Sequence, residues 1–469
     1  MRSCTALIPP GHWFTEGAFH VSANMSAMPR LFGTDGVRGI ANRELTPDLA
    51  LALGRAAGAV LGSPGRATVV GRDTRVSGPM LEAALIAGLC SAGIEVRVAG
   101  VLPSPAVSFL TIDEQAVAGA MISASHNPVD DNGIKFFSAL GFKLTEDVED
   151  EIEARMKAPL TSGPTGAEVG GRSTIAEAAA RYERHLLSSL SVSLEGLKIV
   201  LDCAYGAAWE IGPRVFRAAG ADVVALHDRP DGSKINVDCG STAMGPIAEA
   251  VVAERADMGL ALDGDADRVL AVDDRGEAIE GDRILALTAL HLKARGDLDG
   301  GLVVTTVMSN VGMTRALARG GIEVLQAPVG DRYVVEMMQD RGAILGGEQS
   351  GHIIFGRHST TGDGLLTGLQ LASAVISSAT SLRELARVYD TYPQVLVNVR
   401  VRSVDELDSD EAVWAECAAV ENALGEEGRV LLRASGTEPV VRVMVEASTE
   451  ELARASADRL ADVVRRQLA

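Results

Sequence analysis

The clearest chemical feature of this sequence is the segment DGDADR, which places three carboxylates at alternate positions: Asp263, Asp265 and Asp267. The segment follows the apolar run MGLAL, and its small residues permit a loop that turns all three side chains toward one cation. Without a cation, carboxylates this close repel one another. Mg²⁺ prefers such oxygen ligands together with a substrate phosphate. The alternative is a solvated acidic turn or a series of capping aspartates. A calcium loop of the EF type is disfavoured because its bidentate glutamate is missing.

A second candidate site is the segment SASHNP, which follows the apolar run AVAGAMI. A serine there would be exposed at a sheet edge beside His126 and a proline-stiffened turn, which suits a nucleophile or a carrier of a phosphoryl group. Lys135, in DNGIKFF, could serve as a base or as a partner of a phosphate. The alternative is an Asx-type turn in which His126 makes a structural hydrogen bond. The sequence has no GxSxG segment, so an α/β-hydrolase triad fits poorly.

Two further loops carry polar groups suited to a sugar phosphate. The segment GEQSGH offers short polar side chains and a carboxylate, which suit sugar hydroxyls or an amine, and His352 titrates near neutral pH. The segment RASGTEP lies between two apolar runs and combines two hydroxyls with a flexible glycine, so that Arg433 and Arg442 could bind a phosphate there. It lacks the GK[ST] ending of a Walker loop. The alternatives are a plain loop and an ordinary hairpin turn.

Glycine-rich backbone surrounds one more cation near the start of the chain. Arg38 lies in LFGTDGVRG, where the glycines indicate a tight turn. We interpret this arginine as a possible contact to a phosphate, and the alternative is an ordinary surface charge.

The elements that carry these loops form a pattern that occurs three times. The copies begin at Ala67, Leu197 and Gly301. Each contains a short β-branched run, an amphipathic helix, a glycine turn, a second run, and a third run that ends in SASHNP, DGDADR or GEQSGH. Alternating strands and helices predict α/β layers with largely parallel pairing, in which ligands bind beyond the carboxyl ends of the strands. We therefore expect the three loops to face a shared cleft.

The local signals of the flanking segments agree with this organisation. Thr46 is expected to cap a helix that Pro47 begins and Gly62 ends, with a buried stripe formed by Leu49, Leu53, Ala56 and Val60. From about Gln394 the order is a strand, a helix over 406–424, two hairpin-like strands and a closing helix from Thr449. This order predicts a small α+β domain. We expect an extension over 1–27, disordered or not native, and domains over 28–180, 181–282, 283–393 and 394–469.

Composition limits the classes of function. The chain has 469 residues and a formal net charge of -20, which argues against general nucleic-acid binding and against attachment to anionic membranes. No apolar run reaches the roughly 18 residues of a membrane span. The five cysteines are scattered without a CxxC pair, which indicates reduced thiols in a cytoplasmic protein. At roughly 150 residues per domain, length alone predicts about three domains, one fewer than the pattern.

The segments LFGTDGVRG, ISASHNP, DNGIKFF, DGDADR, GEQSGH and RASGTEPVVRVMVEA occur in this order. Together they closely resemble the α-D-phosphohexomutase superfamily over essentially residues 28–469, and the last two resemble its members that act on glucosamine phosphates. The resemblance implies four domains around a central cleft, each contributing one loop. It also implies a Mg²⁺-dependent isomerase that interconverts glucosamine 6-phosphate and glucosamine 1-phosphate through a phosphoserine and a bisphosphate intermediate. Its product would feed UDP-N-acetylglucosamine and peptidoglycan precursor synthesis.

The resemblance also implies a role for each candidate residue. Ser125 would be the phosphoserine, and its phosphate would share the Mg²⁺ with Asp263, Asp265 and Asp267. Sugar hydroxyls would contact Glu348 and Ser350, with His352 nearby in a catalytic role. The non-reacting phosphate would be held by Arg433, Ser435, Gly436, Thr437 and Arg442. Lys135 and Arg38 would assist proton transfer and charge neutralisation, and Arg268 would lie beside the metal loop.

The expected partners are small hexosamine phosphates, with no nucleic acid, no membrane and a possible homodimer. Two features depart from the family pattern: Tyr205 stands where asparagine is expected, and the family does not need residues before Met28. Three alternatives stay open, namely a phosphomannomutase or phosphoglucomutase, a Mg²⁺-dependent phosphatase, and a non-catalytic sugar-phosphate sensor.

Overall fold

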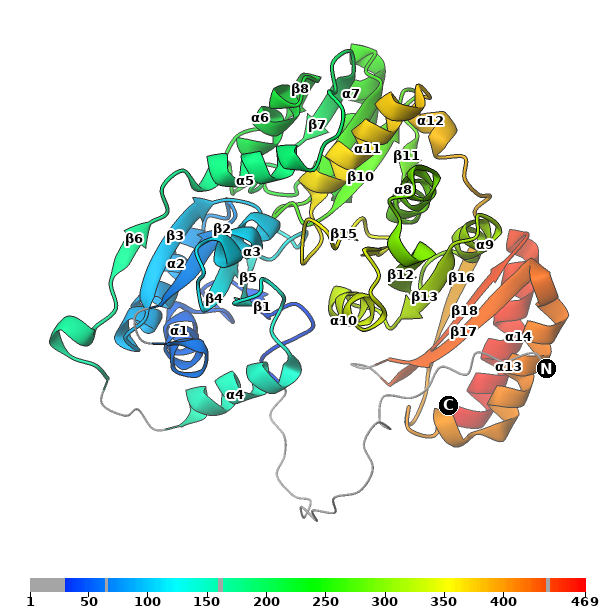
Figure 1. The fold of residues 1–469 in the computed structure, drawn as a ribbon. Coiled ribbons are helices and arrows are strands. Elements are labelled where there is room, and N and C mark those ends of the chain that lie inside the picture. Colours follow the sequence, from blue (N-terminus) through cyan, green and yellow to red (C-terminus); the bar gives the residue numbers. More distant parts are fainter. Residues whose placement is uncertain (1–29, 64–65, 159–162, 436–438) are drawn as a thin grey trace. The chain divides into compact units, whose positions relative to one another are not determined.

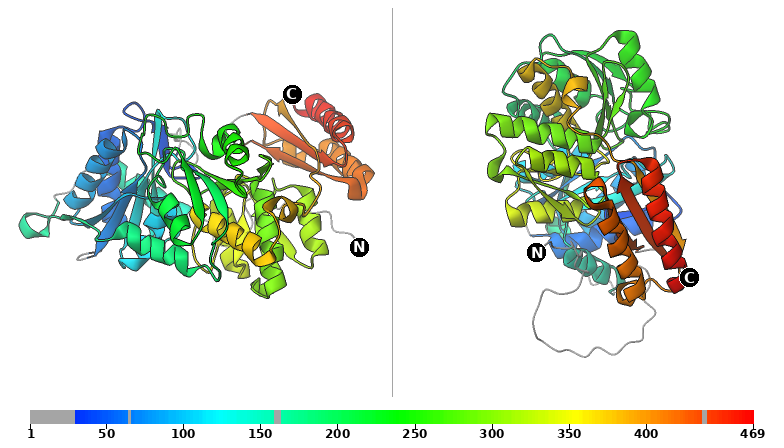
Figure 2. Two further views of the ribbon diagram at one scale, coloured as in Figure 1. Left: turned by 90° about the horizontal axis from the view of Figure 1, so that it is seen from above. Right: turned by 90° about the vertical axis from the view of Figure 1, so that its right-hand side faces the viewer.

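Three of the four sheets repeat one arrangement of strands (Figures 1 and 2). The computed structural model describes residues 30–63, 66–158, 163–435 and 439–469. In the first sheet, two strands pair in parallel with the central β2 and a fourth returns antiparallel: β2 (Ala67–Arg72), β3 (Glu95–Val101), β4 (Ala118–Ile122) and β5 (Asp131–Ser138). The second sheet repeats this order with β7 (Lys198–Asp202), β8 (Asp222–Leu226), β9 (Met258–Leu262) and β10 (Val269–Asp273). The third repeats it with β12 (Leu302–Thr306), β13 (Glu323–Ala327), β14 (Leu345–Gly347) and β15 (Ile353–Phe355). The predicted three similar α/β domains with mixed sheets are therefore confirmed.

Helices connect the parallel strands of each sheet. The connections are α2 (Gly78–Ser91) and α3 (Ser104–Asp113), then α6 (Ile211–Ala218) and α7 (Gly245–Glu254), then α9 (Val311–Arg319) and α10 (Asp331–Arg341). Edge strands extend the first two sheets: β1 (Val37–Ile40), β6 (Arg172–Thr174) and β11 (Ala278–Ile279). The other helices of the three domains are α4 (Glu146–Lys157), α5 (Ala178–Ser188), α8 (Gly281–Arg295), α11 (Gly364–Ser378) and α12 (Leu382–Leu385). Every residue of β4 and β9 is buried, as expected for strands covered on both faces, which is why their sequences are continuous apolar runs.

The helix predicted after Thr46 has the expected ends but a different buried face. It is α1 (Pro47–Leu61), and the Thr46 hydroxyl accepts a hydrogen bond from the backbone N–H of Leu49. Its buried residues are Ala50, Leu53, Gly54, Ala56, Ala57 and Gly58, so only part of the predicted stripe is buried. The reason is its close contact with α2: a Cβ on Gly54 would lie 2.3 Å from the carbonyl oxygen of Leu85. Small residues on this face allow the two backbones to approach.

The C-terminal segment forms the predicted small α+β domain. Its antiparallel sheet has the order β16 (Gln394–Arg400), β18 (Val440–Ala447) and β17 (Gly428–Ala434), and two helices, α13 (Glu411–Leu424) and α14 (Glu450–Leu468), pack on it (Figure 1). The first helix begins later than predicted because Asp410 caps it, accepting a hydrogen bond from the backbone N–H of Val413 at 2.9 Å. None of the helices in the described residues has both the length and the hydropathy that a membrane crossing requires.

Candidate functional site

The three polar loops of the sequence occupy one equivalent position in the three repeated sheets. Each joins the third parallel strand to the antiparallel strand that follows it: β4 to β5, β9 to β10, and β14 to β15. They therefore leave the sheets at the carboxyl ends of parallel strands, where α/β proteins place their ligand sites. The predicted equivalence of the loops is thus present in the strand topology.

The three aspartates after β9 converge. One carboxylate oxygen of each of Asp263, Asp265 and Asp267 lies within 4.8 Å of the others. Their exposed fractions are 0%, 0% and 4%. The solvated acidic turn is therefore wrong, because all three side chains are buried. The glycine between the first two is required by close approach: a Cβ on Gly264 would lie 2.6 Å from the carbonyl oxygen of Ser125.

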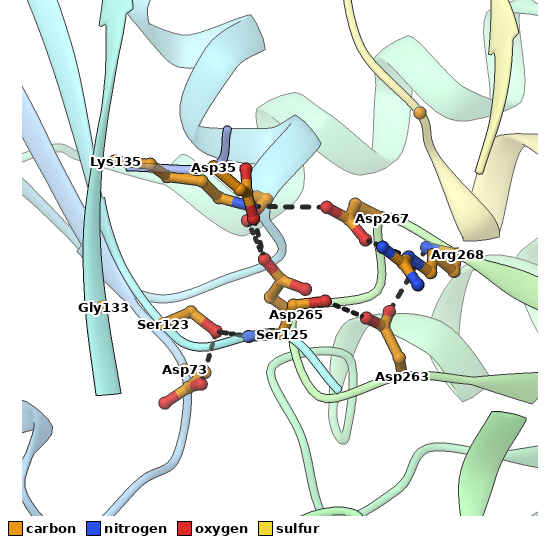
Figure 3. A network of polar contacts seen from close by, with 12 residues as sticks. Asp35, Asp73, Ser123, Ser125, Gly133, Lys135, Asp263, Asp265, Asp267 and Arg268 are labelled. Atoms are coloured by element: carbon orange, nitrogen blue, oxygen red, sulfur yellow. Dashed lines mark hydrogen bonds and ion pairs between the residues drawn. The ribbon is translucent and has the colours of Figure 1, made fainter. Parts of the chain in front are cut away.

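Ser125 points into this triad from the first domain (Figure 3). Its hydroxyl donates a hydrogen bond of 2.5 Å to Asp263 Oδ2, and His126 Nδ1 lies 3.2 Å from the same hydroxyl. Ser125 is 1% exposed, so the expectation of an exposed serine is wrong: the second domain covers it. Two loops far apart in the sequence thus bring one hydroxyl and three carboxylates together.

Lys135 supplies the positive charge on the other side of the carboxylates (Figure 3). It lies on β5, and its Nζ donates to Asp265 Oδ2 at 2.7 Å and to Asp267 Oδ2 at 3.3 Å. Burial of the ammonium works against its charge, but Asp265 and other nearby carboxylates outweigh burial and raise the pKa of Lys135 well above its ordinary value. Lys135 is therefore protonated at neutral pH, which fits charge neutralisation better than the role of a free base.

Two carboxylate oxygens of the triad accept no hydrogen bond. Among the described residues, the buried Asp265 Oδ1 and Asp267 Oδ1 have no hydrogen-bond partner, and a buried carboxylate oxygen without a hydrogen bond is costly. Burial and the neighbouring Asp267 and Asp265 raise the pKa of Asp263 well above its ordinary value. These hard oxygen donors, together with a serine that can carry a phosphate, fit a divalent metal ion.

The loop between β14 and β15 brings His352 to the same triad. Its Nδ1 lies 3.8 Å from Asp267 Oδ1, and its Nε2 accepts a hydrogen bond of 2.9 Å from the backbone N–H of Gly362. Burial of the ring opposes its charged form, but nearby carboxylates, above all Asp267, outweigh burial and raise its pKa. In the same loop the Glu348 carboxylate accepts a hydrogen bond from the backbone N–H of Gly330, and the buried Ser350 hydroxyl has no hydrogen-bond partner in the described part of the chain. The oxygens of Glu348 and Ser350 could each accept a hydrogen bond from a sugar hydroxyl.

Arg38 joins the site through the serine loop. It lies on β1, where it pairs in register with Gly133 of β5. Its guanidinium donates to Asn127 Oδ1 at 2.9 Å and to Asp35 Oδ2. Arg268 lies beside the metal loop as expected: its backbone N–H donates to Asp263 Oδ1 at 3.2 Å.

The sequence analysis missed three charged residues of this site. Lys143 Nζ contacts Asp35 Oδ1 and lies 2.5 Å from Asp331 Oδ2, and Asp331 Oδ2 lies 3.4 Å from His352 Nε2. These contacts connect the first and third domains. A signal existed for Asp35, which lies in the same glycine-rich segment as Arg38, and for Asp331, which follows shortly after the end of β13. Nothing in the sequence around Lys143 indicated its role.

The predicted phosphate loop lies in the C-terminal domain. Arg433 on β17 and Arg442 on β18 are directly opposite each other in the sheet, a placement in which like charges repel. Burial and the neighbouring Arg442 lower the pKa of Arg433, and the buried Ser435 hydroxyl has no hydrogen-bond partner among the described residues. An anion between the two arginines would relieve this repulsion. Gly436 and Thr437 lie outside the described residues.

Comparison with known proteins assigns all four domains to one class. Four parts of the chain match the phosphoglucomutase/phosphomannomutase domains: residues 29–161 domain I, 180–276 domain II, 280–392 domain III and 396–463 the C-terminal domain. The chain therefore belongs to the phosphoglucomutase/phosphomannomutase family within the α-D-phosphohexomutase superfamily. Among its relatives is the phosphoglucosamine mutase of Frankia casuarinae, 52% identical over 451 residues, which cover 94% of this chain and 99% of the relative.

Solved structures agree with this assignment. A phosphoglucomutase/phosphomannomutase family protein of Burkholderia thailandensis is 27% identical, with a TM-score of 0.81 over 93% of this chain and 97% of that one. An N-acetylphosphoglucosamine mutase of Aspergillus fumigatus, solved with GlcNAc-6P and magnesium, has a TM-score of 0.64 over 93% and 95% of the two chains. At 18% identity it shows the shared fold alone.

Proposed function

We propose that this chain is a phosphoglucosamine mutase, an isomerase that interconverts glucosamine 6-phosphate and glucosamine 1-phosphate. The observation that carries the proposal is the Ser125 hydroxyl, held 2.5 Å from Asp263 Oδ2 in a triad of buried carboxylates. The substrate follows from relatives about half identical over nearly the whole chain. The product would enter UDP-N-acetylglucosamine synthesis in the cytoplasm.

Ser125 carries the phosphoryl group in this proposal. In the first half-reaction the bond from phosphorus to Oγ of phospho-Ser125 breaks, a bond forms from phosphorus to the sugar O1, and the O1 proton ends on Oγ. The resulting bisphosphate reorients in the site. Its 6-phosphoryl group then moves to Oγ of Ser125, and the proton of Oγ ends on the sugar O6. Phosphoryl transfer of this kind depends on positioning and charge neutralisation more than on covalent chemistry.

Asp263, Asp265 and Asp267 would hold Mg²⁺ together with the phosphate on Ser125. The ion fits the two carboxylate oxygens that accept no hydrogen bond from the described residues, and the Aspergillus enzyme of the same fold was solved with magnesium. When bound, Mg²⁺ would polarise the phosphoryl oxygens and neutralise charge. Lys135 and Arg38 would add positive charge beside the same group. His352 of the third domain would stabilise the negative charge of Asp267. Its Nδ1 faces this carboxylate, and its Nε2 is fixed by the backbone N–H of Gly362.

The remaining residues would bind the sugar phosphate. Glu348 and Ser350 would contact sugar hydroxyls, and the non-reacting phosphate would lie between Arg433 and Arg442 with Ser435, Gly436 and Thr437. We place the domain boundaries at 180, 282 and 393, after an extension over 1–27. Because the bisphosphate presents either end to the same groups, one sugar loop and one phosphate loop suffice.

Mass spectrometry of the purified protein tests the role of Ser125. We expect a fraction carrying an extra mass of about 80 Da, localised to Ser125, because phosphorylation adds that increment. Ser125→Ala should lose mutase turnover by at least about 10³-fold while glucosamine 6-phosphate still binds. Turnover that persists in Ser125→Ala would contradict the phosphoserine mechanism.

The nearest alternative is a phosphomannomutase or phosphoglucomutase. Comparison of kcat/KM on glucosamine, glucose and mannose 6-phosphates separates these activities. A preference for either neutral hexose would contradict the proposed substrate. A Mg²⁺-dependent phosphatase would release free phosphate, and a non-catalytic sensor would bind without turnover.

A further inference from the structure

Arg75 is fully buried, and its guanidinium binds the backbone of the loop that carries Ser125. Its relative exposure is 0%. Nη2 donates to the carbonyl oxygens of Ser125 at 3.0 Å and Asn127 at 2.8 Å, and Nη1 donates to those of Pro128 at 2.5 Å and Asp131 at 2.9 Å. One side chain therefore fixes four carbonyl groups of this loop. None of these contacts involves a side chain that would react.

Asp73 and Ser123 extend the same network to the other peptide group of Ser125 (Figure 3). Asp73 pairs with Arg75 at 3.0 Å and accepts a hydrogen bond of 2.6 Å from the Ser123 hydroxyl. The Ser123 oxygen in turn accepts a hydrogen bond of 2.9 Å from the backbone N–H of Ser125. Asp73 and Ser123 are 0% and 3% exposed, so neither hydrogen bond competes with bulk water.

Asn236 holds the loop from the second domain. Its Nδ2 donates to the carbonyl oxygen of Ser125 at 2.8 Å and to that of Asn127 at 3.3 Å. The Ser125 carbonyl therefore accepts hydrogen bonds from both domains. This domain also supplies Asp263, so the contact fixes the serine relative to its carboxylate partner.

The backbone of Ser125 needs such restraint. Its φ is +52°, in the left-handed region that residues other than glycine rarely adopt. Such a conformation persists only where surrounding contacts impose it, and it is common at functional sites. At Ser125 the peptide N–H and the carbonyl are both fixed, and the side chain projects toward Asp263.

We propose that Asp73, Arg75, Ser123 and Asn236 form a backbone clamp that positions Ser125 for phosphoryl transfer. This inference rests on the proposed function and names positioning residues for the same site. Among the described residues, these four side chains form their hydrogen bonds and ion pairs with the serine loop and with one another, and none with the sugar loop or the phosphate loop. It therefore sets the rate at which Ser125 gives and takes the phosphoryl group, and it leaves substrate affinity unchanged.

The test uses the full-length protein and removes one hydroxyl. Ser123→Ala should lower kcat at least tenfold while KM for glucosamine 6-phosphate stays within twofold. Phosphorylation of Ser125 from a hexose 1,6-bisphosphate should slow by a similar factor. Ser123→Thr, which keeps the hydroxyl, should recover kcat to within threefold of the wild type. Ser91→Ala is the matched control, because the Ser91 hydroxyl also makes two hydrogen bonds, to Gly88 and Arg55, away from the loop. It should leave kcat unchanged.

Asn236→Ala removes the contact that the second domain makes with the serine loop, and it tests the clamp independently if Ser123→Ala does not fold. We expect this variant to lower kcat at least fivefold at unchanged KM. If Ser123→Ala and Asn236→Ala both kept the kcat of the wild type, the clamp would be overturned. A change in KM without a change in kcat would also overturn it. Failure of the proposed function looks different, because the wild type itself would then show no mutase turnover.

Discussion

Single aspartates of the triad differ in how well their negative charge is stabilised. Burial opposes the charge of Asp267, but Lys135 and other cationic neighbours outweigh burial and hold its pKa well below the ordinary value. Asp263 behaves in the opposite way, because burial and the two other aspartates raise its pKa. Without a metal ion, Asp263 therefore takes up a proton before Asp267 does. Binding of a divalent cation must displace that proton.

This balance predicts that Asp263→Asn stabilises the metal-free protein. A carboxyl group whose pKa is raised by folding favours the protonated form, so it destabilises the fold increasingly as pH rises above its unfolded pKa. A neutral amide removes that penalty. We expect Tm in EDTA at pH 7.5 to rise by about 2 °C, an increment typical of a change below 1 kcal/mol. Differential scanning calorimetry measures it.

The same variant should lose the stabilisation that millimolar Mg²⁺ gives to the wild type, because one ligand is gone. Asp458→Asn, on the exposed side of α14, is the control for removal of a surface carboxylate and should leave both values unchanged. A lower Tm of Asp263→Asn in EDTA would contradict the charge argument.

Some residues of the site could be predicted from the sequence because they lie close together along the chain. The triad lies within one short segment, so its convergence could be predicted from alternate positions alone. Lys143 and Asp331 are single charges in separate segments, and only the folded chain brings them within 2.5 Å. Arg75 was missed for the same reason, since its four acceptors are backbone carbonyls that carry no sequence signal. Residue types predict chemistry within a segment, whereas contacts between segments require the fold.

At the scale of elements, the repeated strand order was predictable and the packing faces were not. Apolar runs and glycine turns placed the strands of all three repeated sheets, because buried parallel strands have a strong compositional signal. The buried face of α1 was predicted as the stripe Leu49, Leu53, Ala56 and Val60. Leu53 and Ala56 are buried, but the rest of the buried face consists of small residues, since α2 packs against Gly54. Periodicity identifies an amphipathic helix but does not reveal a neighbour that requires glycine.

Gly54→Ala should therefore destabilise the first domain although alanine is the better helix former. The new Cβ would lie 2.3 Å from the carbonyl oxygen of Leu85 in α2, so the two helices must separate. Overpacking costs about 1–3 kcal/mol, and a contact of 2.3 Å with a backbone oxygen belongs in the upper part of that range, about 2–3 kcal/mol, which exceeds the gain of about 1 kcal/mol in helix propensity. Urea unfolding monitored by circular dichroism should show a net loss of about 1–2 kcal/mol.

Gly245→Ala is the matched control for this substitution. Gly245 is the first residue of α7, and a Cβ there meets no atom within 4 Å. Its stability should equal or slightly exceed that of the wild type. Equal stability of Gly54→Ala and Gly245→Ala would show that the α1–α2 contact adjusts without cost.

At the scale of the whole molecule, the net charge of -20 hides a site with a local supply of cations. Arg38, Lys135, Lys143 and Arg268 all contact carboxylates of the site. A strongly negative net charge is therefore compatible with the proposed binding of a phosphorylated sugar. Local contacts decide the ligand, and the net charge decides only long-range attraction.

One of these cations also links separate domains. Lys143 follows β5 in the first domain, and Asp331 begins α10 in the third. Their side chains are 12% and 13% exposed, and their charged atoms lie 2.5 Å apart. Burial opposes both charges, but the pairing outweighs it: the pKa of Lys143 is raised and that of Asp331 is lowered. The pair thus stabilises the contact between two domains that supply different loops of the site.

The losses from breaking this pair at either side should not be additive. Lys143→Met leaves a buried carboxylate without its nearest ammonium, and Asp331→Asn leaves the ammonium with only Asp35. We expect each single variant to lose about 2–4 kcal/mol of unfolding free energy, and the double variant to lose clearly less than the sum. Lys157→Met is the control, because Lys157 is 63% exposed in its pair with Glu153 and should cost about 0.5 kcal/mol or less.

The pH dependence of the coupling distinguishes an ion pair from simple packing. Since folding lowers the pKa of Asp331, its share of the stability is complete above the ordinary aspartate pKa and is lost as pH falls through the lowered value. Since folding raises the pKa of Lys143, its share is complete below the ordinary lysine pKa and is lost as pH rises through the raised value. The coupling energy from the double-mutant cycle should therefore persist between about pH 5 and pH 9, with a change only where the neighbouring His352 titrates, and it should decrease in strong acid. Additive losses, or a coupling that does not change with acid, would mean that Lys143 and Asp331 join the two domains by packing alone.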